Sequence, residues 1–364
     1  MIRQLPIEAE LVDDINKYLA LVYNYGLFQG TILVAQNGEI LIQKGYGFTD
    51  ARWKIPITPA TKFMIGSLSK QFTALIILQL VQQGKLDLNA HIIEYLPDYR
   101  TDIGSKIKVK HLLTNTSGLA NYVDRSDFRR EIAGHYFNQP EFFRAYCMPD
   151  ILFLPGSRYD YSNTNFNLLS YIAEKIYKQS FGVILQKQIF SRLDMKDSGS
   201  LSRLSITNEY STRYNSGGDW HSAGQNIFWD NYQGAGNIYS TVEDLYKWNQ
   251  ALLSYTLITK ELTNKMFAPH VPICKNSYYG YGIVVTFLPD STKIIEHPGK
   301  LHGFKSYNLI CPDHKISISI LCNSGIQPRP IGLNIFKILQ GEGFRDINTI
   351  ILRPNYKFMD NLGG

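Results

Sequence analysis

Apolar residues recur along the chain at two different spacings, one typical of helices and one typical of strands. A helical period near the start predicts an amphipathic helix that ends near Gly26. Two β-rich runs follow at 31–36 and 39–44, and Asn37-Gly38 between them is a strong hairpin signal. The apolar positions of the first helix are Leu11, Ile15, Leu19 and Val22.

The other end of the chain also favours strands. Apolar runs at 281–287, 294–297 and 304–310 and an alternating run at 316–320 are separated by turn residues. A helix over 331–339 is then predicted to stop at Gly341. Between these ends the periodicity is mostly helical, with helices predicted at 72–83, 166–177 and 242–252.

This order of elements predicts an α+β fold of the α/β/α sandwich type, as a single unit over 1–364. A central antiparallel sheet is built from both termini and flanked by the terminal helices, and an all-helical lobe is inserted between its halves. The sheet-bearing part comprises residues 1–66 and 248–364, and the helical lobe comprises 67–247. A cleft at the seam between them is the expected place for a site.

Composition narrows the class of protein. With 44% hydrophobic and 19% charged residues the chain matches ordinary globular proteins. A net charge of +6 without a dense Lys/Arg run gives no reason to expect a nucleic-acid partner. The longest apolar stretch, 74–81, is too short for a transmembrane segment.

Other features leave compartment and assembly open. The first ten residues lack the apolar segment of a secretory signal, so the chain is either cytoplasmic or a processed periplasmic or secreted form. The sequence carries no signal for an oligomeric state. The four cysteines have no metal-binding spacing, so we interpret them as small buried hydrophobes and predict no metal site. They are Cys147, Cys274, Cys311 and Cys322.

The first candidate for chemistry is the pair Ser67 and Lys70, three residues apart where a turn enters a nearly all-apolar helix. That spacing places both on one helix face, and a helix start offers free N–H groups to a developing oxyanion. A partly buried lysine loses its charge more readily and can accept or relay the serine proton. A second S-x-x-K, Ser105 to Lys108, lies in a polar stretch, so the context favours Ser67.

Tyr161 and Asn163 form the second candidate, in a loop between Pro155-Gly156 and a helix predicted near Thr164. The phenol can shuttle a proton to a leaving group, and the amide can bridge Lys70 and a substrate. Two structural alternatives remain open, because Asn163 is a favourable helix N-cap and Tyr161 can be a core aromatic. Tyr136 and Asn138 repeat the same spacing.

The third candidate is His297-Pro298-Gly299 at the end of a predicted strand. Gly299 allows a substrate to lie flat along the strand edge, and the Lys300 N–H can complete an oxyanion hole with the Ser67 N–H. The alternative is that His297 is a surface or supporting residue near a turn.

Taken together, these segments resemble the class C β-lactamase and DD-peptidase superfamily, the penicillin-recognising serine hydrolases, with their related esterases and D-amino-acid peptidases. The likeness runs from about residue 30 to 323. The matching segments are G-S-L-S-K-Q-F-T-A at 66–74, H-L-L-T-N-T-S-G-L at 111–119, P-G-S-R-Y-D-Y-S-N-T-N at 155–165 and G-N-I-Y-S-T-V-E-D-L at 236–245.

The resemblance implies a role for each candidate and no metal or organic cofactor. It implies Ser67 as acylated nucleophile, Lys70 as its activator, Tyr161 as general base in acylation and activator of the hydrolytic water, Asn163 as a contact of substrate and lysine, and His297 in the place of the lysine of a K-T-G motif.

Two departures from the superfamily bear on the substrate. Histidine is mostly neutral at pH 7, so His297 attracts a substrate carboxylate less than a lysine does. Pro298 replaces the usual threonine or other small residue and removes a hydroxyl and an N–H. Both weaken the case for a dedicated β-lactamase.

We therefore expect a serine hydrolase that acts on a small-molecule or peptide substrate and cleaves an ester, amide or D-amino-acid peptide bond. The alternatives are a true β-lactamase or DD-carboxypeptidase, and a catalytically silent penicillin-binding or scaffold protein. The substrate depends on loops at 124–149 and 202–230. We expect the segment from Asp124 to Pro149 to form a lid or a recognition surface.

Overall fold

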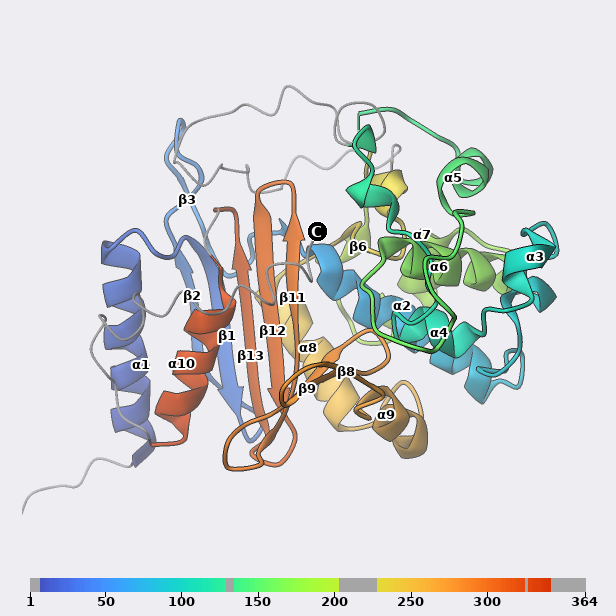
Figure 1. The fold of residues 1–364 in the computed structure, drawn as a ribbon. Coiled ribbons are helices and arrows are strands. Elements are labelled where there is room, and N and C mark those ends of the chain that lie inside the picture. Colours follow the sequence, from blue (N-terminus) through green and yellow to red (C-terminus); the bar gives the residue numbers. More distant parts are fainter. Residues whose placement is uncertain (1–6, 129–133, 203–227, 325–326, 342–364) are drawn as a thin grey trace, which may run out of the picture.

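The computed structural model describes residues 7–128, 134–202, 228–324 and 327–341. Its centre is an eight-stranded antiparallel sheet in the order β2-β1-β13-β12-β11-β10-β9-β8 (Figure 1). The strands are β1 (Gly30–Gln36), β2 (Glu39–Tyr46), β8 (Val271–Cys274), β9 (Ser277–Tyr279), β10 (Val284–Phe287), β11 (Lys293–Leu301), β12 (Phe304–Cys311) and β13 (Ile316–Cys322).

The two ends of the chain meet inside this sheet, as the sequence predicts. Strand β1 pairs with β13 along its whole length, from Gly30 opposite Cys322 to Gln36 opposite Ile316. The predicted β1–β2 hairpin is present, and both Asn37 (φ 54°) and Gly38 (φ 87°) have the positive φ that a type I′ turn requires.

Helices cover both faces of the sheet and make the predicted α/β/α layers (Figure 1). Helices α1 (Ile7–Asn24) and α10 (Arg329–Leu339) pack on one face through an apolar cluster that includes Leu19 and Ile335. Helix α8 (Val242–Leu253) packs against β1 and β13 on the other face.

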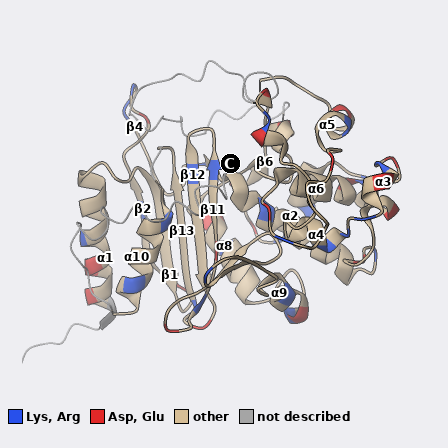
Figure 2. Cartoon of the chain, in the orientation of Figure 1, with Lys and Arg blue, Asp and Glu red and all other residues tan. Residues whose placement is uncertain are grey.

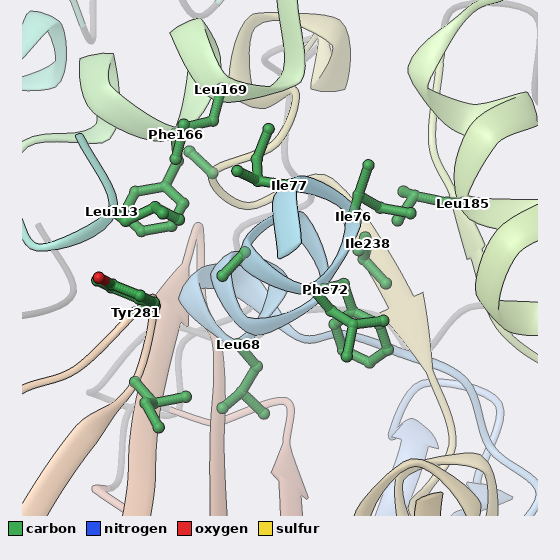
Figure 3. Close-up of a cluster of buried hydrophobic side chains, with 14 of the residues drawn as sticks. Leu68, Phe72, Ile76, Ile77, Leu113, Phe166, Leu169, Leu185, Ile238 and Tyr281 are labelled. Atoms are coloured by element: carbon green, nitrogen blue, oxygen red, sulfur yellow. The ribbon is translucent and has the colours of Figure 1, made fainter. Parts of the chain in front are cut away.

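The inserted lobe surrounds helix α2 (Ser69–Gln82), whose residues from Ser69 to Leu80 are all buried. Figure 3 shows Phe72 and Ile76 of α2 among side chains from several other elements, including Phe166 and Leu185. A helix that is buried on all sides is a central core helix, which makes α2 a rigid support. The other α-helices of the described residues are α3 (Thr101–Gly104), α4 (Val109–Leu113), α5 (Gln139–Tyr146), α6 (Asn163–Tyr177), α7 (Phe181–Leu185) and α9 (Lys260–Met266). A π-helical turn, η5 (Gln186–Phe190), continues α7. The 3₁₀ turns are η1 (Gly66–Leu68), η2 (Ile92–Glu94), η3 (Tyr122–Asp124) and η6 (Trp229–Tyr232).

The structure differs from the expected lobe in one respect, because the lobe is not entirely helical. Within 67–247, strands β6 (Gly199–Ser200) and β7 (Ile238–Ser240) join β5 (Phe63–Met64) in a small sheet. In the expected sheet-bearing part, β3 (Phe48–Asp50) pairs with β4 (Ile55–Pro56) outside the main sheet. Strands of two or three residues are too short to leave a period in the sequence.

The far edge of the sheet holds two strands that were not predicted and one cysteine that corrects an expectation. Strands β8 and β9 were not predicted, since β8 contains Pro272, which demotes a run to an edge strand. Cys274 on β8 is exposed, whereas Cys147, Cys311 and Cys322 are buried as predicted.

Charged residues are spread over the molecule. Figure 2 shows Lys and Arg interspersed with Asp and Glu on the helices of both parts. Among the described residues, no helix is both long enough and apolar enough to cross a bilayer. The same residues contain no group of three or more His, Cys, Asp or Glu side chains arranged to hold a metal ion.

Candidate active site

The turn that carries Ser67 is held tightly against β11. Gly66 has φ +52°, a conformation that favours glycine, and a Cβ there would lie 2.9 Å from the Lys300 nitrogen. A Cβ on Gly299 would lie 2.2 Å from the Ile65 carbonyl oxygen. Glycine on both sides therefore lets the backbone of the Ser67 turn approach the backbone of β11.

Lys70 is fully buried one helical turn after Ser67. Its Nζ donates to Asn163 Oδ1 (2.7 Å) and to the carbonyl oxygen of Ala235 (2.8 Å), and it lies 3.1 Å from Ser67 Oγ. Burial holds the pKa of Lys70 well below its ordinary value. The oxygens of Asn163 and Ala235 can only accept hydrogen bonds, so Lys70 always donates to them. When the amine is neutral, its lone pair can instead accept a hydrogen bond from the Ser67 hydroxyl.

Tyr161 approaches Ser67 from the other side. Its hydroxyl donates to Ser67 Oγ (2.7 Å), and its ring lies 4.8 Å from Lys70 Nζ. Burial raises the pKa of Tyr161 above its ordinary value, an effect that the bond to Ser67 only partly offsets. The phenol therefore keeps its proton at neutral pH and acts first as a donor.

Asn163 is oriented by a residue that the sequence analysis did not single out. The Asn121 side-chain oxygen accepts from the Asn163 backbone N–H (2.9 Å) and from its Nδ2 (3.3 Å). Asn163 Oδ1 is thereby turned toward Lys70. The N-cap of α6 is Ser162, so the alternative of Asn163 as a helix cap does not hold.

His297 is fully buried on β11. Its Nδ1 lies 2.6 Å from the Pro298 carbonyl oxygen, so Nδ1 carries the proton, and Nε2 accepts from the Tyr279 hydroxyl at 3.2 Å. Burial and the nearby Lys70 lower the pKa of His297 to about 3, which keeps the imidazole neutral. In this conformation the ring faces Tyr279, whose own ring meets Tyr161 edge to face.

The edge of β11 beside the site is open. Strand β10 pairs with residues 293–296 only, so among the described strands residues 297–301 have β12 on one side and none on the other. The turn η1 packs against β11, with Gly66 beside Lys300. Lys300 brings its backbone to Gly66, while its side chain is exposed.

The second copies of the motifs have structural partners instead. The exposed Ser105 donates to the Thr101 carbonyl oxygen, and Asn138 caps α5 by accepting from the Glu141 N–H. Ser67, Lys70, Tyr161 and Asn163 are thus brought together, and His297 stands behind them. Parts of the two expected substrate loops, residues 129–133 and 203–227, lie outside the described residues.

Sequence analysis missed the Ala235 carbonyl, Asn121 and Tyr279. Ala235 adjoins the G-N-I-Y-S-T-V-E-D-L segment, which was the available signal, but a backbone carbonyl leaves no mark of its own.

The chain is similar to known proteins over most of its length. A family model described as Beta-lactamase matches residues 11–339. The putative penicillin-binding protein PbpX of Bacillus subtilis is 29% identical over 281 residues, which cover 77% of this chain and 67% of that protein.

Solved structures show the same fold. The octameric penicillin-binding protein homologue from Pyrococcus abyssi has a TM-score of 0.78 at 24% identity, covering 90% of this chain and 78% of its own. The D-amino acid amidase from Ochrobactrum anthropi SV3 has a TM-score of 0.78 at 20% identity, covering 92% and 99%. Because the family model spans most of the residues, including every site residue described above, the chain belongs to the beta-lactamase family.

Proposed function

We propose that the protein is a serine hydrolase that forms an acyl-enzyme on Ser67 and cleaves an ester, amide or D-amino-acid peptide bond. Family membership supports a serine hydrolase in general. The observation that carries the finer proposal is that Ser67 Oγ lies within hydrogen-bonding distance of both Lys70 Nζ and the Tyr161 hydroxyl.

Acylation begins with the neutral amine of Lys70. It takes the proton of Ser67 as Oγ forms a bond to the carbonyl carbon of the substrate. The N–H groups of Ser67 and Lys300 stabilise the oxyanion, since η1 and β11 meet backbone to backbone at Gly66. When the bond to the leaving group breaks, Tyr161 donates its proton to that group and recovers one from the Lys70 ammonium.

Hydrolysis reverses these transfers with water as the incoming group. Tyr161 accepts a proton from the water and passes its own to Lys70, and the water oxygen bonds to the acyl carbon. Lys70 then returns a proton to Ser67 Oγ as the acyl group departs. In this sequence the phenol relays protons and does not begin as a tyrosinate, in keeping with the raised pKa of Tyr161. Asn163 holds the lysine in reach of both groups.

The neutral His297 favours substrates that carry no carboxylate next to the scissile bond, because no fixed cation stands at this position. The likeness to a D-amino acid amidase supports the same preference. A DD-carboxypeptidase or β-lactamase is the second candidate, favoured by the relatives named as penicillin-binding proteins. A catalytically silent binder is the third candidate. Such a protein has no need of the contacts among Ser67, Lys70 and Tyr161, and their presence therefore favours an enzyme.

Intact-protein mass spectrometry after exposure to a fluorophosphonate tests the enzyme proposal. We expect one adduct on the wild-type protein and none on Ser67→Ala, with Ser105→Ala as the matched control that keeps full labelling. Absence of an adduct on the wild type, or an equal adduct on Ser67→Ala, would remove the proposal.

Rates on three substrates separate the candidates within the enzyme class. We expect a chromogenic ester and a D-amino acid amide to be turned over faster than a D-Ala-D-Ala peptide or a cephalosporin. A cephalosporin rate that exceeds the others by orders of magnitude would make the protein a β-lactamase.

A further inference from the structure

The turn between β11 and β12 uses an unusual residue. Leu301 pairs with Phe304, and the two residues between them, His302 (φ 43°) and Gly303 (φ 91°), both have positive φ. A two-residue turn of this kind favours Asn-Gly or Asp-Gly. The β1–β2 hairpin of the same sheet follows that preference with Asn37-Gly38. Local conformation alone therefore does not account for a histidine at position 302.

The imidazole of His302 reaches across the seam between the sheet and the lobe. Its Nε2 lies 2.5 Å from the hydroxyl oxygen of Tyr232, which is only 4% exposed on η6. The two rings meet edge to face at 5.3 Å, and Trp229 lies 5.9 Å from the imidazole in the same kind of contact. The turn of the oxyanion strand is thus fastened to the lobe.

Tyr232 also organises the loop that binds Lys70. Its carbonyl oxygen accepts from the N–H groups of Ala235 (3.0 Å) and Gly236 (2.8 Å), which closes a tight turn. The carbonyl oxygen of Ala235 in that turn accepts from Lys70 Nζ, and that of Gly234 accepts from Thr73 of α2. Tyr232 therefore shapes the loop that binds Lys70 through its backbone carbonyl, and it binds His302 through its side-chain hydroxyl.

The other end of the contact lies close to the proposed oxyanion site. His302 follows Lys300 by two positions, and the Lys300 nitrogen meets the backbone of Gly66. Gly236 lies between Leu301 and Gly66, since a Cβ on it would be in ordinary van der Waals contact with both, at 3.6 Å and 3.8 Å. A movement of the β11–β12 turn away from η6 would open this packing at the residue before Ser67.

We infer that Tyr232 and His302 are a pair of positioning residues that sets the Lys300 N–H against Ser67 while the same loop holds Lys70. The inference rests on the proposed function, because it assigns the Lys300 N–H to the oxyanion. The pair acts through backbone placement. Oxyanion donors act on the transition state, so loosening the pair lowers kcat and leaves KM nearly unchanged.

His302→Asn is a sharp test because it supplies the residue that the turn itself prefers and removes the contact with Tyr232. We expect kcat on a chromogenic ester and the rate of fluorophosphonate labelling to fall about tenfold, with the melting temperature unchanged or higher. Tyr232→Phe keeps the ring and should give the same loss in kcat. His314→Asn, in the β12–β13 turn, is the matched control and should retain full activity.

The double variant separates one contact from two independent effects. If the pair acts as a unit, His302→Asn with Tyr232→Phe loses no more than either single variant. Unchanged labelling in His302→Asn or in Tyr232→Phe would overturn the inference while leaving Ser67 as the nucleophile. If His302→Asn lowers the melting temperature, the kcat of Tyr232→Phe decides the question. If the wild-type protein forms no fluorophosphonate adduct, the proposed function itself is contradicted.

Discussion

Glu296 and His297 are neighbours on β11 whose side chains leave the strand on opposite faces of the sheet. Glu296 accepts from Arg329 Nε (2.8 Å) and Nη2 (2.7 Å) at the start of α10, and Tyr307 and Thr286 also donate to it. His297 points to the Lys70 side. The strand that borders Ser67 is therefore anchored by a buried ion pair on the opposite face of the sheet.

Loss of Arg329 should cost stability in a pH-dependent way. Burial alone raises the pKa of Glu296, but Arg329 and the hydroxyl donors outweigh it and hold that pKa below its ordinary value. The stabilisation is therefore present above the ordinary pKa and is lost as the pH falls through the lowered one. Arg329→Met leaves the carboxylate buried without its partner and should cost about 3–5 kcal/mol at pH 7.

The penalty of Arg329→Met should be smaller at pH 5, because the unpaired Glu296 can be protonated. Urea unfolding at both pH values measures the difference. Arg100→Met is the control, since its partners Asp102 and Asp150 are exposed and its removal should cost under about 1 kcal/mol. An equal penalty for Arg329→Met at pH 5 and pH 7 would contradict the assignment.

Tyr161 and Tyr159, two residues apart, should respond differently to loss of the side-chain hydroxyl. Tyr161→Phe removes the donor to Ser67 and should slow acylation about 10²- to 10⁴-fold. The buried hydroxyl of Tyr159 has no hydrogen-bond partner among the described residues, so Tyr159→Phe should leave activity intact and stability equal or higher. Stopped-flow acylation rates and thermal unfolding of both variants check this, and equal rate losses would refute the proton relay.

The pH profile of acylation should reveal the neutral form of Lys70. Because burial lowers the pKa of Lys70, the rate should rise with pH through that lowered pKa and show no further rise near 10.5, its ordinary value. Asn163→Leu removes an acceptor that stabilises the ammonium, so the rising limb should move to lower pH. A limb that moves to higher pH in this variant would assign the titration to another group.

Gly66→Ala should damage activity more than stability. The positive φ costs about 1–2 kcal/mol for alanine, and a Cβ 2.9 Å from the Lys300 nitrogen forces β11 away from Ser67. Gly84→Ala is the matched control, because Gly84 has φ +68° with nothing within 4 Å of a Cβ. Similar losses of stability with a much larger fall in kcat for Gly66→Ala are expected, and equal kcat values would contradict the role of this close approach.

The elements that form from local signals were predictable from sequence. The Asn37-Gly38 turn, the α1 period and the apolar run of α2 each contain their own physical cause. The same holds for the fold class. The structure also places a buried helix directly after Ser67 and none directly after Ser105, as the sequence indicates.

Features that depend on tertiary contacts were not predictable. The Ala235 carbonyl reaches Lys70 only because a turn of the lobe folds over α2, and Asn121 lies 42 residues from the Asn163 it orients. The orientation of His297 toward Tyr279 depends on strand β9. That strand was not predicted, and its neighbour β8 contains a proline that weakens the strand pattern in the sequence. Burial also decides which of Lys70 and Tyr161 carries a proton, and burial is known only once the chain is folded.

The pairing of β1 with β13 has a consequence for biosynthesis. Ser67 on η1 is synthesised long before β11 and β13, and β1 must await β13 to fill its open edge. Such long sequence separations slow folding and postpone the last step of assembly. Until β11 is made, Ser67 has no strand opposite it, so the proposed site is completed only late in the synthesis of this chain.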